Sequence, residues 1–481
     1  MKRNIRFLLT TLSAISVWSI TGCDDLLDKT SRTSLSASSI FETQSRIEGQ
    51  VNGIYKLLKS SSLYGGRIHL YLDVRGEDFI NVTGNTYTAY ESWTNSYNSG
   101  SNDISNLWNA AYQVINNTNI LIDGLEKLEG VIPEKQKMQY VAEAKFVRAL
   151  AYYTLVTVFA PPYNQDSGAS KAIPLRLDPE TSGHNNDLAR STVKTIYDQI
   201  LSDLDYSETS LPESYETALL NTIRAHRNTA ISLKTRIYLN SGQYDKVIEE
   251  AKKIVPQADA PFSATSGVAH SLQEDILTIF NSSYTTNESV FSMPMTASDS
   301  YSGQASIGYI YYGNREYYLN PDGIVNDGLW GSTDARRDLL SLNENKYYLK
   351  KYAKASPYVD YIPVIRYAEV LLNYAEALAQ RDNLSLAEKL LKAVHARSDA
   401  DYVFPSGALD TKDHLLASIW KERRIELLGE GFRSGDLLRL LLPLPAKGGG
   451  GLQTGEIQPT AANYIFPYPN SEINANKLLL D

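Results

Sequence analysis

Apolar side chains recur at three- and four-residue steps along much of the chain. Residues 42–59 carry them at Ile47, Val51, Ile54, Tyr55 and Leu58. This spacing is typical of an amphipathic helix with one buried face. The same pattern predicts further helices at 105–129, 133–159, 192–206, 226–240, 244–255, 364–381, 385–399 and 411–429. A capping-box pattern from Ser271 to Glu274 predicts one more short helix.

Two of the predicted helix pairs are alike. Helix 226–240 is joined to helix 244–255 by a short turn, and helix 364–381 is joined to helix 385–399 in the same way. Small residues at the crossing points and a tyrosine near each turn are typical of tetratricopeptide-like hairpins. Because such a hairpin cannot bury both of its faces alone, we expect the pairs to stack. The pattern therefore predicts a mostly α-helical scaffold.

Two long insertions interrupt this helical pattern, at residues 60–104 and 257–350. They are rich in Gly, Ser, Asn, Asp and Tyr and show little helical period, with short strands predicted at 289–295 and 346–352. Loops of this length inside a compact protein are usually functional. We therefore expect a loop-rich lobe from these insertions and a helical scaffold from about 39–59, 105–256 and 351–440. The glycine run Gly448 to Gly451 is predicted to be a mobile connector.

The N-terminus has the pattern of a lipoprotein signal peptide. Basic residues precede an apolar stretch from Phe7 to Ile20, which is too short to span a membrane comfortably. Thr21 and Gly22 then lead to Cys23, the only cysteine of the 481 residues. We expect residues 1–22 to be removed, Cys23 to carry the lipid, and the polar residues 23–38 to form a tether. Residues 39–481 are then predicted to form a single domain.

Charge and composition narrow the function further. The formal net charge is −9, and it becomes −12 without residues 1–22, which hold three basic residues and no acidic one. An acidic chain argues against nucleic-acid binding, which needs clustered Lys and Arg. The 33 Tyr against 11 Phe favour surfaces where an apolar ring and a polar hydroxyl both make contacts, as in sugar or peptide recognition.

A search for catalytic patterns finds no nucleophile elbow, no His-Glu-x-x-His and no complete phosphate-binding loop. The six histidines are scattered singly along the sequence, so no metal site, no cofactor and no catalytic residue is predicted. Paired carboxylates of a glycosidase are compatible with so acidic a chain. The dense charges from Trp420 to Leu437 have helical spacing and are interpreted as structural.

Motifs along most of the chain resemble the RagB/SusD family of outer-membrane nutrient-binding lipoproteins. The matching segments follow one another in the family's order: Cys23 to Asp28, Val51 to Tyr55, Leu107 to Tyr112, Glu143 to Leu150, Asp334 to Arg336, Ile365 to Leu372, Tyr374 to Leu378, Glu422 to Glu426, Phe432 to Leu437 and Phe466 to Pro469. Lys392 and His395 depart from the pattern, because Asn and Arg are commoner there.

The resemblance implies a SusD-like fold with stacked tetratricopeptide-like pairs, a variable ligand lobe and few strands. It also implies an extracellular position at the outer membrane and a SusC-like TonB-dependent transporter as partner. By position in the family, the ligand-binding candidates lie in the two insertions: Asp73, Arg75, Trp93, Tyr97, Asn98, Tyr309, Tyr311, Tyr312 and Trp330. Rings would stack on sugar faces while polar groups bind hydroxyls.

Three hypotheses remain at this point. The leading one is a lipid-anchored protein that captures glycans, or peptides in place of glycans, and delivers them to the transporter. A surface glycoside hydrolase is the second, and it would release product from an oligosaccharide. A protein-protein adaptor is the third, and it predicts no change in small-ligand affinity when Trp93 and Trp330 are replaced by Ala.

Overall fold

The computed structural model describes residues 37–182, 186–281, 284–449 and 451–481. The predicted signal peptide, Cys23 and most of the predicted tether lie outside these residues. Within them, sixteen α-helices and ten short strands confirm a mostly α-helical fold. No described helix combines the length and apolar character that crossing a bilayer requires.

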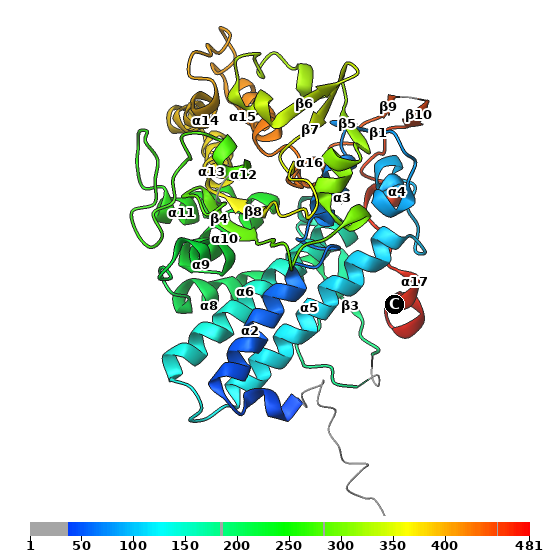
Figure 1. Cartoon of the computed structure of the whole chain (residues 1–481), viewed down its shortest axis with the longest axis vertical. Helices are drawn as coiled ribbons and strands as arrows, with labels where there is room; N and C mark the ends of the chain where they lie inside the picture. Colours follow the sequence, from blue (N-terminus) through cyan, green and yellow to red (C-terminus); the bar gives the residue numbers. More distant parts are fainter. Residues whose placement is uncertain (1–36, 183–185, 282–283, 450) are drawn as a thin grey trace, which may run out of the picture.

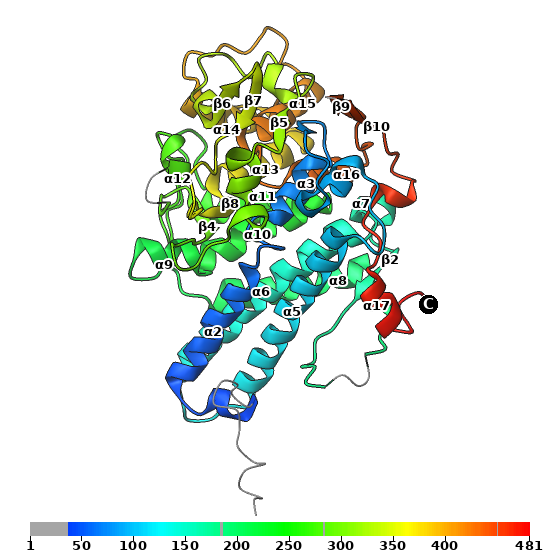
Figure 2. The ribbon, with the colours of Figure 1, turned by 45° about the vertical axis from the view of Figure 1, so that its right-hand side comes forward.

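Four long helices form one end of the molecule, and most of the strands lie toward the other end (Figures 1 and 2). These helices are α2 (Gln44–Leu58), α5 (Asn102–Glu126), α6 (Glu134–Phe159) and α8 (Val193–Ser210). Helix α6 packs against α2, α5 and α8, and from Tyr140 to Phe159 it is buried on nearly every side. Pro133 precedes its first turn, where the missing N–H costs nothing.

The two predicted hairpins are present and stack as expected. They are α10 (Arg227–Asn240) with α11 (Tyr244–Ile254), and α13 (Tyr367–Gln380) with α14 (Leu384–Ser398). Gly242 and Asp382 adopt positive φ in the two turns. Helix α13 packs against α10 and α11, where Ala377 meets Tyr238 and Val247. Helix α15 (Lys412–Glu426) covers α13 and α14 in turn.

Shorter helices connect the scaffold to the loops. They are α3 (Arg67–Val74), α4 (Tyr90–Thr94), α7 (Tyr163–Asp166), α9 (Ala218–Ile223), α12 (Leu277–Asn281), α16 (Arg433–Arg439) and α17 (Asn470–Ala475). The capping-box prediction was wrong in position, because Ser271 forms a β-bridge with Ser263 and α12 begins only at Leu277. There Asp275 accepts the Leu277 N–H at 2.8 Å, so an acidic side chain supplies the cap.

All the described strands pair as two-stranded antiparallel sheets. The pairs are β1 (Phe79–Asn81) with β5 (Tyr317–Leu319), β2 (Lys171–Pro174) with β3 (Arg190–Thr192), β4 (Ser289–Met293) with β8 (Ile362–Arg366), β6 (Leu340–Asn343) with β7 (Lys346–Leu349), and β9 (Lys447–Gly449) with β10 (Leu452–Thr454). Strands β4 and β7 begin where the sequence predicted strands. The predicted connector at Gly448 instead contributes to the hairpin β9–β10, so that prediction was wrong.

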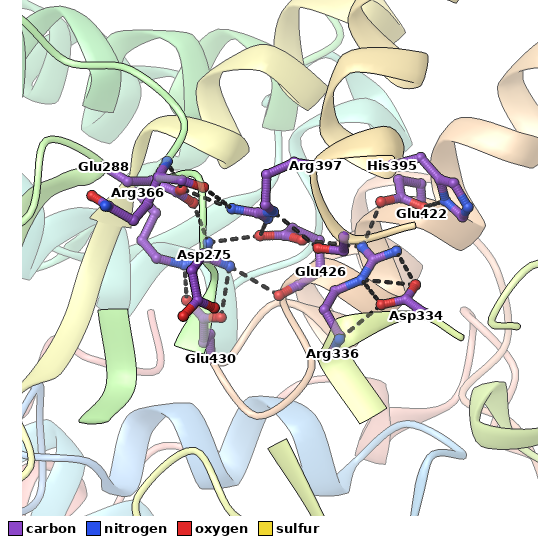
Figure 3. A network of polar contacts seen from close by, with 12 residues as sticks. Asp275, Glu288, Asp334, Arg336, Arg366, His395, Arg397, Glu422, Glu426 and Glu430 are labelled. Carbon is purple, nitrogen blue, oxygen red and sulfur yellow. Dashed lines mark hydrogen bonds and ion pairs between the residues drawn. The ribbon is translucent and has the colours of Figure 1, made fainter. Parts of the chain in front are cut away.

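A buried ionic network joins β8 to α15 and to the loops on either side (Figure 3). Arg366 is 1% exposed and donates to Glu288 at 2.5 Å, to Glu426 at 2.7 Å and to Glu430 at 2.7 Å. Arg397 adds further bonds to Glu288 and Glu426. Burial opposes the charge of Glu426, but the neighbouring guanidinium groups outweigh it and hold its pKa well below the usual value.

The structural interpretation of the 420–437 charges is therefore supported, and the ion pairs extend beyond this segment. Glu422 and Glu426 pair with Arg336, which lies far away in sequence, instead of pairing along their own helix. Arg423 likewise binds Asp436 of α16 at 2.8 Å and the Asn373 amide oxygen at 2.7 Å. The charges thus fix how α15 packs against other elements.

We expect Arg366→Met to lower the free energy of unfolding by roughly 3–5 kcal/mol, because it leaves Glu288, Glu426 and Glu430 buried with too few cations. Urea unfolding followed by circular dichroism measures the change. The control is Arg381→Met, which breaks an exposed pair with Asp245 and should have little effect. Equal losses for the two variants would contradict a special role for the buried network.

Two buried histidines come together although 44 residues separate them in sequence. The rings of His226 and His270 stack with their centroids 5.2 Å apart, and His270 Nδ1 bonds the Asn287 carbonyl oxygen at 2.8 Å. Burial lowers the pKa of His270 to about 4 and that of His226 well below 6.5. Both rings are therefore neutral in the folded protein near pH 7.

The folded protein should lose stability in mild acid because of this pair. The unfolded chain binds protons at these histidines below about pH 6.5, whereas the folded chain resists protonation of His270 until about pH 4 and holds the pKa of His226 well below its usual value. His270 alone then contributes a loss of roughly 2 kcal/mol between pH 7 and pH 5. We expect His270→Gln to weaken this pH dependence in urea unfolding at the two pH values, and the exposed control His414→Gln to leave it unchanged. An unaltered slope in His270→Gln would refute the assignment.

Candidate functional site

The loop-rich lobe is built around the two-stranded sheets β1–β5 and β6–β7. Strand β5 packs against β7, and the Tyr317 hydroxyl donates to the Thr88 carbonyl oxygen at 2.7 Å. The fully buried Glu316 carboxylate accepts hydrogen bonds from Thr83, Thr88 and Asn314. Residues of both predicted insertions are thereby held in one structure.

Most of the predicted ligand-binding residues are buried in this lobe. Six of them have side chains with almost no exposed surface: Asp73, Arg75, Trp93, Tyr97, Tyr311 and Trp330. Tyr309 and Tyr312 are half-buried, and Asn98 is exposed. A ring that is enclosed on both faces has no free face for a sugar to stack on. In this conformation the six buried side chains therefore act as packing residues, and their role in binding stays a prediction.

The contacts of these buried residues explain why they are enclosed. Trp93 donates its indole N–H to the Phe79 carbonyl oxygen at 2.7 Å, under the ammonium of Lys447. Arg75 donates to the Tyr97 hydroxyl at 3.0 Å and to the Tyr464 carbonyl oxygen at 2.6 Å. The C-terminal segment thus closes over this part of the lobe. Among the nine predicted ligand-binding residues, only Arg75 and Tyr97 are hydrogen-bonded to each other.

Asp73 and Trp330 lie in separate surroundings. Asp73 accepts the backbone N–H of Gly431 at 2.8 Å and of Phe432 at 3.2 Å, so it fastens α3 to the turn between α15 and α16. Trp330 is 3% exposed and lies under the guanidinium of Arg337, whose Cζ is 4.4 Å from the ring centroid. The predicted residues are therefore not gathered into one pocket.

The most exposed rings of the lobe were not predicted from the sequence. Tyr87 is 59% exposed in the short 3₁₀ helix Thr86–Thr88, and Tyr347 is 37% exposed on strand β7 itself. Three polar side chains of the lobe also reach solvent at least in part: Asn314, Arg315 and Lys346. Lys346 Nζ is 4.8 Å from the Tyr318 ring centroid and faces the opposite side of β7 from Tyr347. We call these five residues (Tyr87, Asn314, Arg315, Lys346 and Tyr347) the lobe surface. Open rings and polar donors on one lobe suit recognition of a sugar face and its hydroxyls.

A groove of about 340 Å³ between α5 and the C-terminal segment is a second candidate. Its exposed amides, Asn109 and Gln113, lie one turn apart on α5. Other polar groups of the groove already have hydrogen-bond partners. Asn116, for example, exchanges two hydrogen bonds with the backbone of Glu180. Trp108 in its wall is 1% exposed and packs edge-on against Phe159. The groove offers amides but little ring surface, so the lobe surface is the better sugar-binding candidate.

Comparisons with known proteins agree with this architecture. A family model described as starch-binding and associating with the outer membrane matches residues 25–239, and the SusD family model matches residues 266–480. A SusD superfamily structure from Bacteroides fragilis is 31% identical, with a TM-score of 0.83, and the match covers 92% of this chain and 100% of that one. The chain belongs to the SusD superfamily.

More distant SusD relatives match along the same length. A structure described as a putative sugar binding protein from Bacteroides vulgatus is 25% identical, with a TM-score of 0.78, covering 92% of this chain and 98% of that chain. A curated SusD-like protein of Formosa agariphila is 24% identical over 537 residues, covering 100% of this chain and 98% of its own. The predicted family and the SusD-like fold are therefore confirmed.

Proposed function

We propose that this SusD-like protein is a cell-surface lipoprotein that binds oligosaccharides and delivers them to a SusC-like TonB-dependent transporter. The observation that carries the proposal is the match, over nine-tenths of the chain, to superfamily structures that include a putative sugar binding protein. The family description as starch-binding and associating with the outer membrane supports both the ligand class and the location. The signal-like N-terminus with Cys23 supplies the anchor.

The lobe surface is the proposed contact for the sugar. Its two exposed tyrosine rings can each cover the C–H face of a pyranose, while Arg315 and Asn314 donate to hydroxyls. The surface is held rigidly from below by the Glu316 hydrogen bonds and by strand pairing of β5 with β1. Such support keeps the rings in place before the ligand arrives, which limits the entropy lost on binding.

The proposal includes no catalytic step. Burial raises the pKa of Asp73 to about 7 and that of Asp103 to about 6, as a general acid would require. Both carboxyls are enclosed, however, and they already accept hydrogen bonds, Asp73 from Gly431 and Asp103 from the Ser92 hydroxyl at 2.8 Å. A glycosidase needs two carboxyl groups that face the bound sugar. Asp73 and Asp103 are therefore assigned to the fold.

We expect Tyr87→Ala and Tyr347→Ala each to weaken oligosaccharide binding by about tenfold, because one sugar–ring stack contributes on the order of 1.4 kcal/mol. A glycan array that includes malto-oligosaccharides selects the ligand, and isothermal titration calorimetry measures its affinity. Trp93→Ala should instead lower the free energy of unfolding by roughly 3–5 kcal/mol. The control is Tyr206→Ala on α8, a half-buried ring far from the lobe in sequence and on the helical end of the molecule.

Each other outcome of this experiment points to a different function. Unchanged affinity in both lobe-surface variants would move the binding site elsewhere, with the α5 groove as the next candidate. Binding on a peptide array alone would replace glycan by peptide as the cargo. Release of reducing sugar from the array ligand would contradict the non-catalytic assignment, and binding of neither ligand class would favour a protein-protein adaptor.

The anchor is testable separately. We expect Cys23→Ser to abolish acylation at that position and to move the protein from the outer-membrane fraction to a soluble one, because no other side chain of the chain carries a thiol. Fractionation with immunoblotting measures the distribution, and palmitate labelling measures the acylation. The affinity of the purified variant for its oligosaccharide should be unchanged. Continued membrane association without label would show that another element holds the protein there.

A further inference from the structure

A second polar site lies at the C-terminal end of α14, away from the lobe surface. Asp334, His395 and Asp399 are all buried there, and each places one potential ligand atom within 4.8 Å of the others. His395 belongs to the last turn of α14, Asp399 caps that helix, and Asp334 precedes the short 3₁₀ helix Ala335–Leu339. Asp334 and His395, which are 61 residues apart in sequence, therefore converge on one point.

The His395 ring has one nitrogen bonded and one without a partner. Its Nδ1 lies 2.7 Å from Glu422 Oε2, while Nε2 is buried and finds no hydrogen-bond partner among the described residues. Glu422 also accepts a bond from Arg336 at 2.5 Å, so it acts toward His395 as an acceptor (Figure 3). This places the imidazole proton on Nδ1 and leaves the Nε2 lone pair free. A carboxylate behind a histidine in this way is the usual outer support of a metal-binding imidazole.

The two carboxylates are also oriented by neighbours. Asp334 accepts from the Arg336 backbone N–H at 2.8 Å, from Arg336 Nε at 3.0 Å and from Arg336 Nη2 at 2.6 Å, and Asp399 accepts from the Thr333 hydroxyl at 3.2 Å. A carboxylate has about four lone-pair sites, so Asp334 with three donors keeps one for a further partner and Asp399 keeps more. His395 and Asp399 also line a cavity of about 500 Å³, which has room for a cation and for water in its remaining positions.

The local balance of charge favours a cation at this point. Four buried or nearly buried cationic side chains belong to the adjoining network: Arg336, Lys351, Arg366 and Arg397. They pair with five carboxylates: Glu288, Asp334, Glu422, Glu426 and Glu430. Asp399 is buried beside this network and has no ion pair among the described residues, so a bound cation would supply the partner that its charge lacks. Uncompensated buried charge is costly.

We propose that Asp334, His395 and Asp399 bind one divalent transition-metal ion, with Zn²⁺ as the best match. One imidazole nitrogen and two carboxylate oxygens suit zinc, whereas Ca²⁺ and Mg²⁺ prefer oxygen ligands alone. The ion fastens the loop that follows α14 to the segment around Thr333. This site does not depend on the proposed glycan function, because none of its residues belongs to the lobe surface.

Zinc binding by the tag-free full chain tests the site. After incubation with Zn²⁺ and dialysis, we expect one retained equivalent by plasma mass spectrometry. His395→Gln and Asp399→Asn should each weaken zinc binding at least tenfold, because each variant loses one ligand of the ion. Competition with a chromophoric chelator measures the affinity. The matched control is the exposed His414→Gln, which should bind zinc as the parent does.

Thermal unfolding gives an independent readout. Zinc should raise the Tm of the parent and of His414→Gln but not of Asp399→Asn, and Ca²⁺ should raise none of them. Asp399→Asn lies at a helix end outside the Arg366 contacts, so it keeps the test valid if His395→Gln fails to fold. The proposal is overturned if the parent retains no zinc, or if Asp399→Asn binds zinc as tightly as the parent. A water molecule at Nε2 would then account for that atom.

Discussion

The fold depends on a set of charges that have been removed from water together. Arg366 is the last residue of strand β8. It forms ion pairs with Glu288, which precedes β4, with Glu426 at the end of α15, and with Glu430 in the turn that follows α15. Each of these ions is costly to bury alone, so the arrangement is stable only when all the partners are present. This requirement fixes the position of the α15–α16 corner relative to the hairpins and to the small β4–β8 sheet. The loops of the lobe are attached to that corner through Arg336 and Lys351.

The helices of this fold could be predicted from the sequence because the features that define them act over short stretches of chain. An amphipathic period, a proline at a first turn and small residues at crossings each act within one helix or one hairpin. Even α6, which is buried on nearly every side, was bounded correctly by Pro133 and the prolines after Phe159. The ion pairs were not predictable in the same way. Arg366 and Glu426 are 60 residues apart, and charge spacing along α15 suggested partners on the same helix.

The candidate site was less predictable because exposure is a tertiary property. Trp93 and Tyr87 occur in the same Tyr- and Ser-rich insertion, and nothing local separates a ring that packs from a ring that faces solvent. Trp93 is enclosed because Lys447 and the β9–β10 hairpin, more than 350 residues later, cover it. The histidines illustrate the same limit of local sequence. All six are isolated from one another in the sequence, yet His226 and His270 stack on each other in the fold. An irregular loop has no regular backbone pairing to stabilise it. The packing of a large buried ring often stabilises such a loop instead.

The division between scaffold and lobe has a consequence for function. The long helices and stacked hairpins obtain their stability from burial and from the complete ionic network, and neither involves the lobe surface. Tyr87 and Tyr347 can therefore be exchanged at little cost to the fold, whereas Trp93 and Arg366 cannot. A protein built in this way can change its ligand by changing a few exposed rings while the helical end keeps its shape. A constant scaffold with an adjustable surface would suit the proposed role of binding oligosaccharides.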